Sequence, residues 1–160
     1  MSENAPRALT EDEQKIVEDL DENFDGFISA LMEMTGDFAE RVGLPDPHLI
    51  VQYPERYLAD VTEVLRNEEL EDSDLEWILP RVAFLTAEIL CERLGGGWFV
   101  NIVPDTEYFA RYVIGNFRPG TKPGAMVDPL GAAADFLALP PGRDFTGYLK
   151  RMENALTVED

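Results

Sequence analysis

Residues 75–100, LEWILPRVAFLTAEILCERLGGGWFV, decide how this chain folds. Apolar side chains recur on all sides of the segment from Leu75 to Leu94, so a helix here has little polar face and is expected to be central and buried. Pro80 either kinks this helix or marks its true first turn. The glycines at 95–97 end the helix, and the aromatic and β-branched residues after them predict a strand.

The chain before this segment is helical and acidic. Apolar residues recur every three or four positions over residues 10–42, which is typical of one long amphipathic helix with a capping box at its first turn. Gly36 is a candidate position for a kink in this helix. The proline-rich residues 43–53 predict a loop with a short strand, and Pro54 can open a second helix.

After this segment, the pattern of apolar residues becomes typical of β-strands. Residues 98–103 and 108–114 predict a β-hairpin, and residues 125–127 are a candidate third strand. Asp128 and Asp144 are expected to cap two short helices. The sequence therefore predicts an α+β fold: N-terminal helices packed on a small antiparallel sheet, then two short C-terminal helices.

Length and composition predict one globular domain. The chain has 160 residues, of which 45% are apolar and 10% aromatic, so residues 1–160 are expected to fold as a single domain. Its polar ends, about 1–10 and 157–160, are expected to fray. Residues 10–94 form an acidic helical half, and residues 95–156 form a half with the hairpin and the last helices.

Negative charge is concentrated in the first half. The net charge is −19, and residues 1–93 carry −17 of it, from 24 acidic and 7 basic residues. A field of this sign repels nucleic acid and anionic membranes and attracts basic surfaces. No signal peptide or membrane-spanning run is visible, and the single cysteine, Cys91, forms no internal disulfide. We therefore expect a cytoplasmic protein with neither a nucleic-acid nor a membrane partner.

Two short segments imitate ligand-binding loops. Residues 21–29, DENFDGFIS, match the first half of a calcium-binding EF-hand loop, but Met32 stands where the bidentate Glu belongs and the helical period runs through the segment. Residues 115–122 imitate a phosphate-binding loop with its Thr and Lys transposed, and Pro119 and Pro123 remove backbone donors. A solvated helix and a turn-rich loop explain these two segments better.

The chain has few side chains of the types that serve as catalytic nucleophiles or bases. The one histidine, His48, lies in the proline-rich loop, and Cys91 lies in the apolar helix, where a buried structural thiol is the usual case. One Cys and one His are too few for a zinc site. We expect no catalytic residue, no metal site and no cofactor. The alternative is a magnesium-dependent hydrolase that uses carboxylates paired at i, i+3 on the first helix, namely Glu22 with Asp25 and Asp37 with Glu40.

The candidate binding site is a run of six acidic residues before the central helix, where Ser73 or Asp74 is expected to be the N-cap. Such a run is either a solvated loop and helix N-terminus or the contact patch for a cationic partner. The six residues are Glu68, Glu69, Glu71, Asp72, Asp74 and Glu76.

The second half resembles small bacterial α+β domains, some of which are immunity proteins that neutralise a toxin. The resemblance lies in the Gly-Gly-x-Trp spacing of residues 95–98, the hairpin, and the Val-x-Pro helix entry at residues 127–129. It covers about 60 residues, implies a binding role without catalysis, and transfers no functional residue. The predicted function is an acidic, immunity-like inhibitor of a basic protein partner such as a toxin. A structural or regulatory protein without a ligand is a further alternative, and the oligomeric state stays open.

Overall fold

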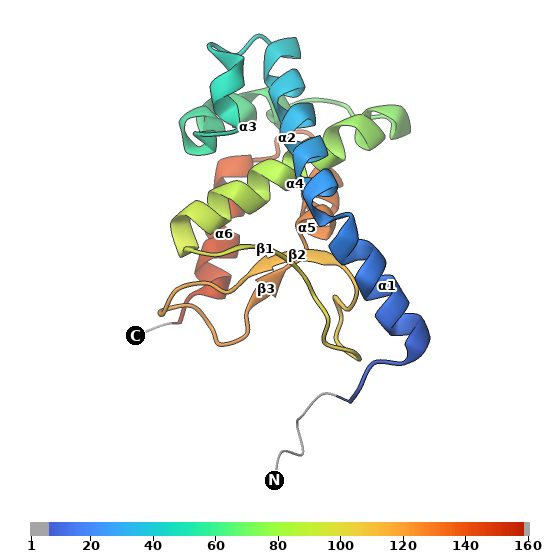
Figure 1. Ribbon diagram of the computed structural model, residues 1–160. Helices are drawn as coiled ribbons and strands as arrows, with labels where there is room; N and C mark the ends of the chain where they lie inside the picture. Colours follow the sequence, from blue (N-terminus) through green and yellow to red (C-terminus); the bar gives the residue numbers. More distant parts are fainter. Residues whose placement is uncertain (1–6, 159–160) are drawn as a thin grey trace.

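The computed structural model describes residues 7–158 and has the predicted α+β architecture (Figure 1). Within that range lie six α-helices, two 3-10 helices and three strands. The elements are α1 Glu11–Glu22, α2 Phe24–Arg41, η1 Pro47–Ile50, η2 Pro54–Tyr57, α3 Leu58–Arg66, α4 Asp72–Leu94, β1 Gly97–Val100, β2 Tyr112–Gly115, β3 Met126–Val127, α5 Pro129–Leu137 and α6 Phe145–Leu156.

The apolar segment forms the central helix, as predicted. α4 crosses the middle of the molecule, with α3 on one side and the sheet on the other, and α2 runs across it (Figure 1). Residues 82–87 of α4 are buried without interruption, and α5 packs along it. Pro80 lies well inside α4 and not in its first turn. The predicted cap was wrong by a few residues: Glu71 is the N-cap, and its N–H donates to the Asp74 carboxylate at 3.1 Å.

The long N-terminal helix is divided at Asn23 and not at Gly36. The predicted capping box is present, with the Thr10 N–H donating to the Glu13 carboxylate at 2.9 Å. The Asn23 side chain donates to the Asp19 carbonyl at 2.7 Å at the end of α1. Gly36 lies within the unbroken α2.

The proline-rich connection contains no strand, which corrects the expectation for residues 43–53. The 3-10 helix η1 takes its place, while η2 begins at Pro54 and leads directly into α3, so Pro54 opens the second helix as predicted. Proline has no N–H to offer a sheet but fits the first turn of a helix, which explains the outcome. The Tyr57 hydroxyl secures the loop because it lies 2.8 Å from the Pro45 carbonyl and 2.7 Å from the Asp46 carbonyl.

The sheet is antiparallel in the order β1–β2–β3, and β1 and β2 are shorter than predicted. The strands end early because residues 101–111 form a structured loop around the buried Asn101. Its side chain accepts from the Val103 N–H and donates to the Thr106 hydroxyl, both at 3.1 Å. Helix α2 covers the sheet through Phe27, whose ring stacks on Tyr112 at 4.1 Å.

The last two helices begin at the predicted caps. Asp128 accepts from the Gly131 N–H at 3.3 Å, and Asp144 accepts from the Gly147 N–H at 3.1 Å. The chain end is held more firmly than expected, because the Val158 N–H donates to the Gly120 carbonyl at 2.8 Å. The other residues expected to fray, 1–6 and 159–160, lie outside the described part. None of the helices within residues 7–158 combines the length and apolar character of a membrane span.

Candidate functional site

All six acids of the predicted binding site are exposed around the start of α4. Glu68 and Glu69 lie in the connection from α3, and Glu71 is the N-cap of the helix. Asp72 and Asp74 occupy the first turn, where the helix dipole favours carboxylates. Glu76 follows at the start of the second turn, so the six residues lie along one short loop and the beginning of α4.

Two of these acids border an apolar groove, which we call the acidic groove. Its volume is about 230 Å³, and its floor comes from α2, α3 and α4. The lining residues are Phe38, Val42, Val64, Leu65, Glu68, Leu70, Asp74, Trp77 and Ile78. The groove thus combines an apolar floor with a carboxylate from each side of the loop that precedes α4.

Buried Arg143 fixes the backbone on one side of the acidic groove. Its Nη1 donates to the Leu65 carbonyl at 2.8 Å and to the Glu68 carbonyl at 2.9 Å. Its Nε and Nη2 donate to the Leu139 carbonyl at 3.1 and 2.8 Å. One guanidinium therefore joins the ends of α3 and α5 and holds the first acid of the run in place.

Trp77 lies in the groove wall between two arginines. The Arg81 guanidinium is 4.0 Å from the centre of the Trp77 ring, and that of Arg41 is 5.3 Å away. Arg81 is almost fully buried, and burial lowers its pKa although the nearby Asp37 opposes the shift. Among the described residues, its Nε has no hydrogen-bond partner. These contacts hold the indole in one orientation, so its fluorescence can report on the groove.

The carboxylates of the hydrolase alternative are exposed along α1 and α2. They are Glu22, Asp25, Asp37 and Glu40. Within residues 7–158, no group of three or more His, Cys, Asp or Glu side chains is arranged to hold a metal ion. The EF-hand lookalike is likewise mostly helical, because Asp25 and Gly26 lie in the first turn of α2.

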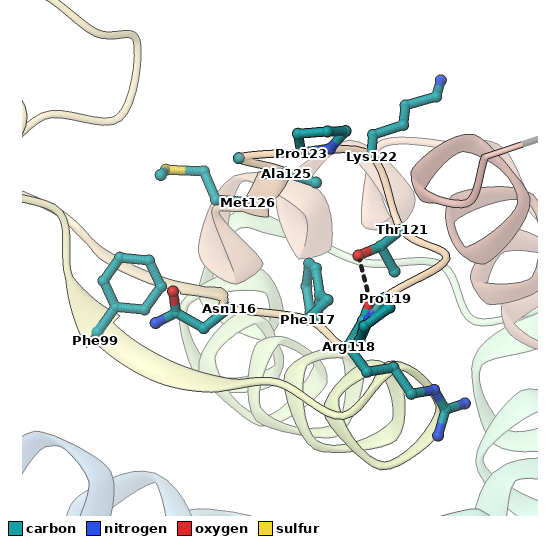
Figure 2. A pocket seen from close by; sticks show the side chains of 11 residues that line it. Phe99, Asn116, Phe117, Arg118, Pro119, Thr121, Lys122, Pro123, Ala125 and Met126 are labelled. Carbon is teal, nitrogen blue, oxygen red and sulfur yellow. Dashed lines mark hydrogen bonds between the residues drawn. The ribbon is translucent and has the colours of Figure 1, made fainter.

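The phosphate-loop lookalike forms the turn-rich connection between β2 and β3. A pocket of about 380 Å³ lies there, between Phe99, Phe117 and the connection. Figure 2 shows the Phe117 ring within it, while the Arg118 and Lys122 side chains extend away. The Thr121 hydroxyl donates to the Arg118 carbonyl at 2.8 Å, and no helix follows. The segment therefore lacks the helix N-terminus that a phosphate loop uses.

Cys91 lies at a third pocket but is built to be unreactive. Burial, assisted by the negative charge of Glu88, raises the pKa of the Cys91 thiol to about 12. Because the thiolate is the nucleophile, we expect iodoacetamide at pH 8 to alkylate the folded protein at least ~100-fold more slowly than the urea-unfolded chain. Mass spectrometry of quenched samples measures both rates, and equal rates would contradict a buried structural thiol.

The acids of the acidic groove could be identified from the sequence, but the apolar residues of its floor could not. Phe38, Leu65 and Ile78 are each explained as core residues of their own helices, and only the packing of α2, α3 and α4 brings them together. The available signal is weak: Leu70 is an apolar residue inside an acidic run, and Trp77 follows that run directly. An aromatic and an aliphatic residue beside clustered acids can therefore mark a groove rather than a plain solvated loop.

Comparisons of the chain with protein-family models, with curated proteins and with solved structures find no match. The resemblance to immunity-type domains therefore stays a prediction.

Proposed function

We propose that this protein is a non-catalytic module that binds a basic protein partner at the acidic groove. The observation that supports this most directly is the apolar floor bordered by Glu68 and Asp74, with four further exposed acids next to it. A solvated acidic loop needs no apolar recess. A partner that places an aliphatic or aromatic side chain among lysines and arginines uses both features.

Charge acts first in this mechanism. The net charge of −19 attracts a basic surface over distances of about one Debye length and raises the association rate at low salt. Carboxylates at the groove edge then pair with partner cations, while burial of an apolar side chain against the half-buried Val64, Leu70 and Trp77 slows dissociation. The association rate is therefore expected to fall steeply with salt, and the dissociation rate much less.

The most concrete form of this proposal is an inhibitor of the immunity-protein type. A toxin that acts on nucleic acid carries a basic active site, and an acidic protein can cover it by mimicking the charge of the substrate. The charge of the chain and the resemblance of residues 95–98 and 127–129 support this form. A basic toxin is therefore the partner that we expect.

A tryptophan titration tests the groove directly. Trp98→Phe leaves Trp77 as the single tryptophan of the two in the chain. We expect a synthetic basic peptide, in which Lys and Arg flank Leu and Phe, to change the Trp77 emission in a saturable way. A peptide with the same charges and Ser in place of Leu and Phe should bind more weakly, because it cannot fill the apolar floor.

Matched charge variants separate the groove from the general field. In the Trp98→Phe background, Glu68→Gln with Asp74→Asn is expected to weaken peptide binding ~5- to 10-fold, as expected for two edge ion pairs. Glu18→Gln with Asp19→Asn on α1 removes the same charge from an exposed helix and should cost less than twofold. Equal losses in both double variants would show that binding follows net charge alone and would overturn the groove as the site.

A further inference from the structure

A further pocket, which we call the tyrosine pocket, lies between the loop at 101–111, β3, α5 and α6. Its volume is about 350 Å³, at the lower end of the range for small-molecule sites. Its polar lining comprises Glu107, Tyr108, Arg111, Asp128, Asp135 and Tyr148. The thioether side chains of Met126 and Met152 complete the wall.

The charges in the tyrosine pocket do not balance. Arg111 donates to the buried Asp128 carboxylate at 2.7 Å, and the other oxygen of Asp128 caps α5, so this pair is internally satisfied. Glu107 and Asp135 are exposed and form no ion pair with any residue in the described part of the chain. Two carboxylates are therefore left to face a ligand, and they favour a cation.

Two tyrosine rings are placed to assist such a cation. Tyr108, Tyr148 and Asp135 line the pocket together. Burial raises the pKa of both tyrosines and the negative charge of Asp135 adds to the shift, while Arg111 opposes it at Tyr108 and Arg151 opposes it at Tyr148. Phe136 packs against Tyr148 at 5.1 Å, and the Tyr148 hydroxyl donates to the Ala132 carbonyl at 3.1 Å. The faces of fixed phenol rings attract organic cations, and thioethers make favourable apolar contacts beside them.

The loop wall of the tyrosine pocket is held in place from inside. Asn101 is almost fully buried, and its side chain bonds Val103 and Thr106 within the loop. The Ala110 N–H donates to the Asn101 carbonyl at 2.9 Å, and the Asn101 N–H donates to the Arg111 carbonyl at 3.0 Å. The segment that carries Glu107, Tyr108 and Arg111 is thus ordered before any ligand arrives.

We propose that the tyrosine pocket binds a small organic cation, of the alkylammonium or alkylguanidinium class. The charged head lies against Asp135 and Glu107 with the tyrosine rings beside it, and a short alkyl chain contacts the methionines. The Arg111–Asp128 pair forms part of the wall, and its guanidinium lies 5.9 Å from the centre of the Tyr108 ring, where the ligand joins it. This site shares no residue with the acidic groove, and its occupancy does not depend on the proposed partner.

Methyl NMR of methionine tests the proposal on the intact chain. With ¹³C-methyl-labelled methionine, butylammonium and butylguanidinium are expected to shift the Met126 and Met152 signals in a saturable way, with a dissociation constant on the order of 1 mM. Met32 and Met34, which lie on α2, are internal references that should not move. Neutral 1-butanol and sodium chloride at the same concentrations should leave the Met126 and Met152 signals in place.

Two variants identify the cation-binding groups. Asp135→Asn and, separately, Tyr108→Leu are each expected to weaken binding of butylammonium about tenfold. Asp19→Asn removes an equally exposed helical carboxylate elsewhere and should leave the affinity unchanged. If Asp135→Asn alters the circular dichroism spectrum, Glu107→Gln in the loop provides the charge test instead.

Three results would overturn the assignment. The first is that 1-butanol shifts the Met126 and Met152 methyl signals as the amines do, which would show a plain apolar pocket. The second is an affinity that Asp135→Asn, or its substitute Glu107→Gln, leaves unchanged. The third is a response to a lysine- or arginine-containing peptide without any response to the free amines, which would assign the pocket to a protein partner.

Discussion

Replacing Arg143 with Ala is expected to lower the free energy of unfolding by about 3–5 kcal/mol. The guanidinium is almost fully buried and donates to the carbonyls of Leu65, Glu68 and Leu139. The bond to the Leu65 carbonyl is buried, and leaving that carbonyl without its donor costs ~1–3 kcal/mol. Loss of the half-buried bonds to Glu68 and Leu139 and of side-chain packing adds to this. Urea unfolding followed by circular dichroism measures the change.

Two further variants show whether the guanidinium itself is responsible. Arg143→Lys is expected to recover less than half of the loss, because one ammonium cannot reproduce a planar fork that reaches three carbonyls. Arg151→Ala, an exposed arginine on α6, should change stability by less than ~0.5 kcal/mol. An Arg143→Ala protein as stable as the Arg151→Ala protein would contradict the clamp.

The clamp also connects the core with the acidic groove. Because Arg143 holds the Glu68 carbonyl, its loss frees the start of the acidic run even where the protein still folds. Peptide affinity at the groove should therefore fall in Arg143→Ala at low temperature, although no acidic side chain has been changed. If Arg143→Ala leaves the peptide affinity unchanged while Glu68→Gln with Asp74→Asn lowers it, the clamp does not contribute to binding at the groove.

Features that depend on neighbouring residues could be predicted from the sequence. The Thr10 capping box and the caps at Asp128 and Asp144 depend on residues within one helical turn, and all three are present. The buried α4 was visible because its apolar residues face all sides, which only a central helix requires.

Features that depend on distant contacts could not be predicted. The division at Asn23 accompanies a long-range contact, in which the Tyr112 hydroxyl donates to the Leu20 carbonyl at 2.7 Å and the α2 ring of Phe27 stacks on Tyr112. The periodicity of residues 10–42 continues through that point, so the sequence alone shows no interruption. The floor of the acidic groove could not be predicted for the same reason, because its residues come from three helices, α2, α3 and α4.

Gly96→Ala is expected to destabilise the fold by about 3 kcal/mol. A Cβ at residue 96 would lie 2.4 Å from the Gly115 carbonyl oxygen and 2.5 Å from Cδ1 of Phe117. The carbonyl belongs to β2, whose Gly115 pairs with Gly97 of β1, so it cannot withdraw without opening the sheet. Overpacking of this kind costs ~1–3 kcal/mol where side chains can adjust, and a backbone obstacle places this case at the upper end.

Gly97→Ala provides the matched control for this prediction. A Cβ at Gly97 would meet no atom within 4 Å, so this variant should stay within about 1 kcal/mol of the parent in the same urea titration. Near-ultraviolet circular dichroism of Trp98 should change in Gly96→Ala and not in Gly97→Ala. Equal stability of the two variants would contradict the close approach. The glycine run after the central helix thus contains separable functions: Gly95, at φ 71°, ends α4, and Gly96 lets the sheet dock against the chain that leaves it.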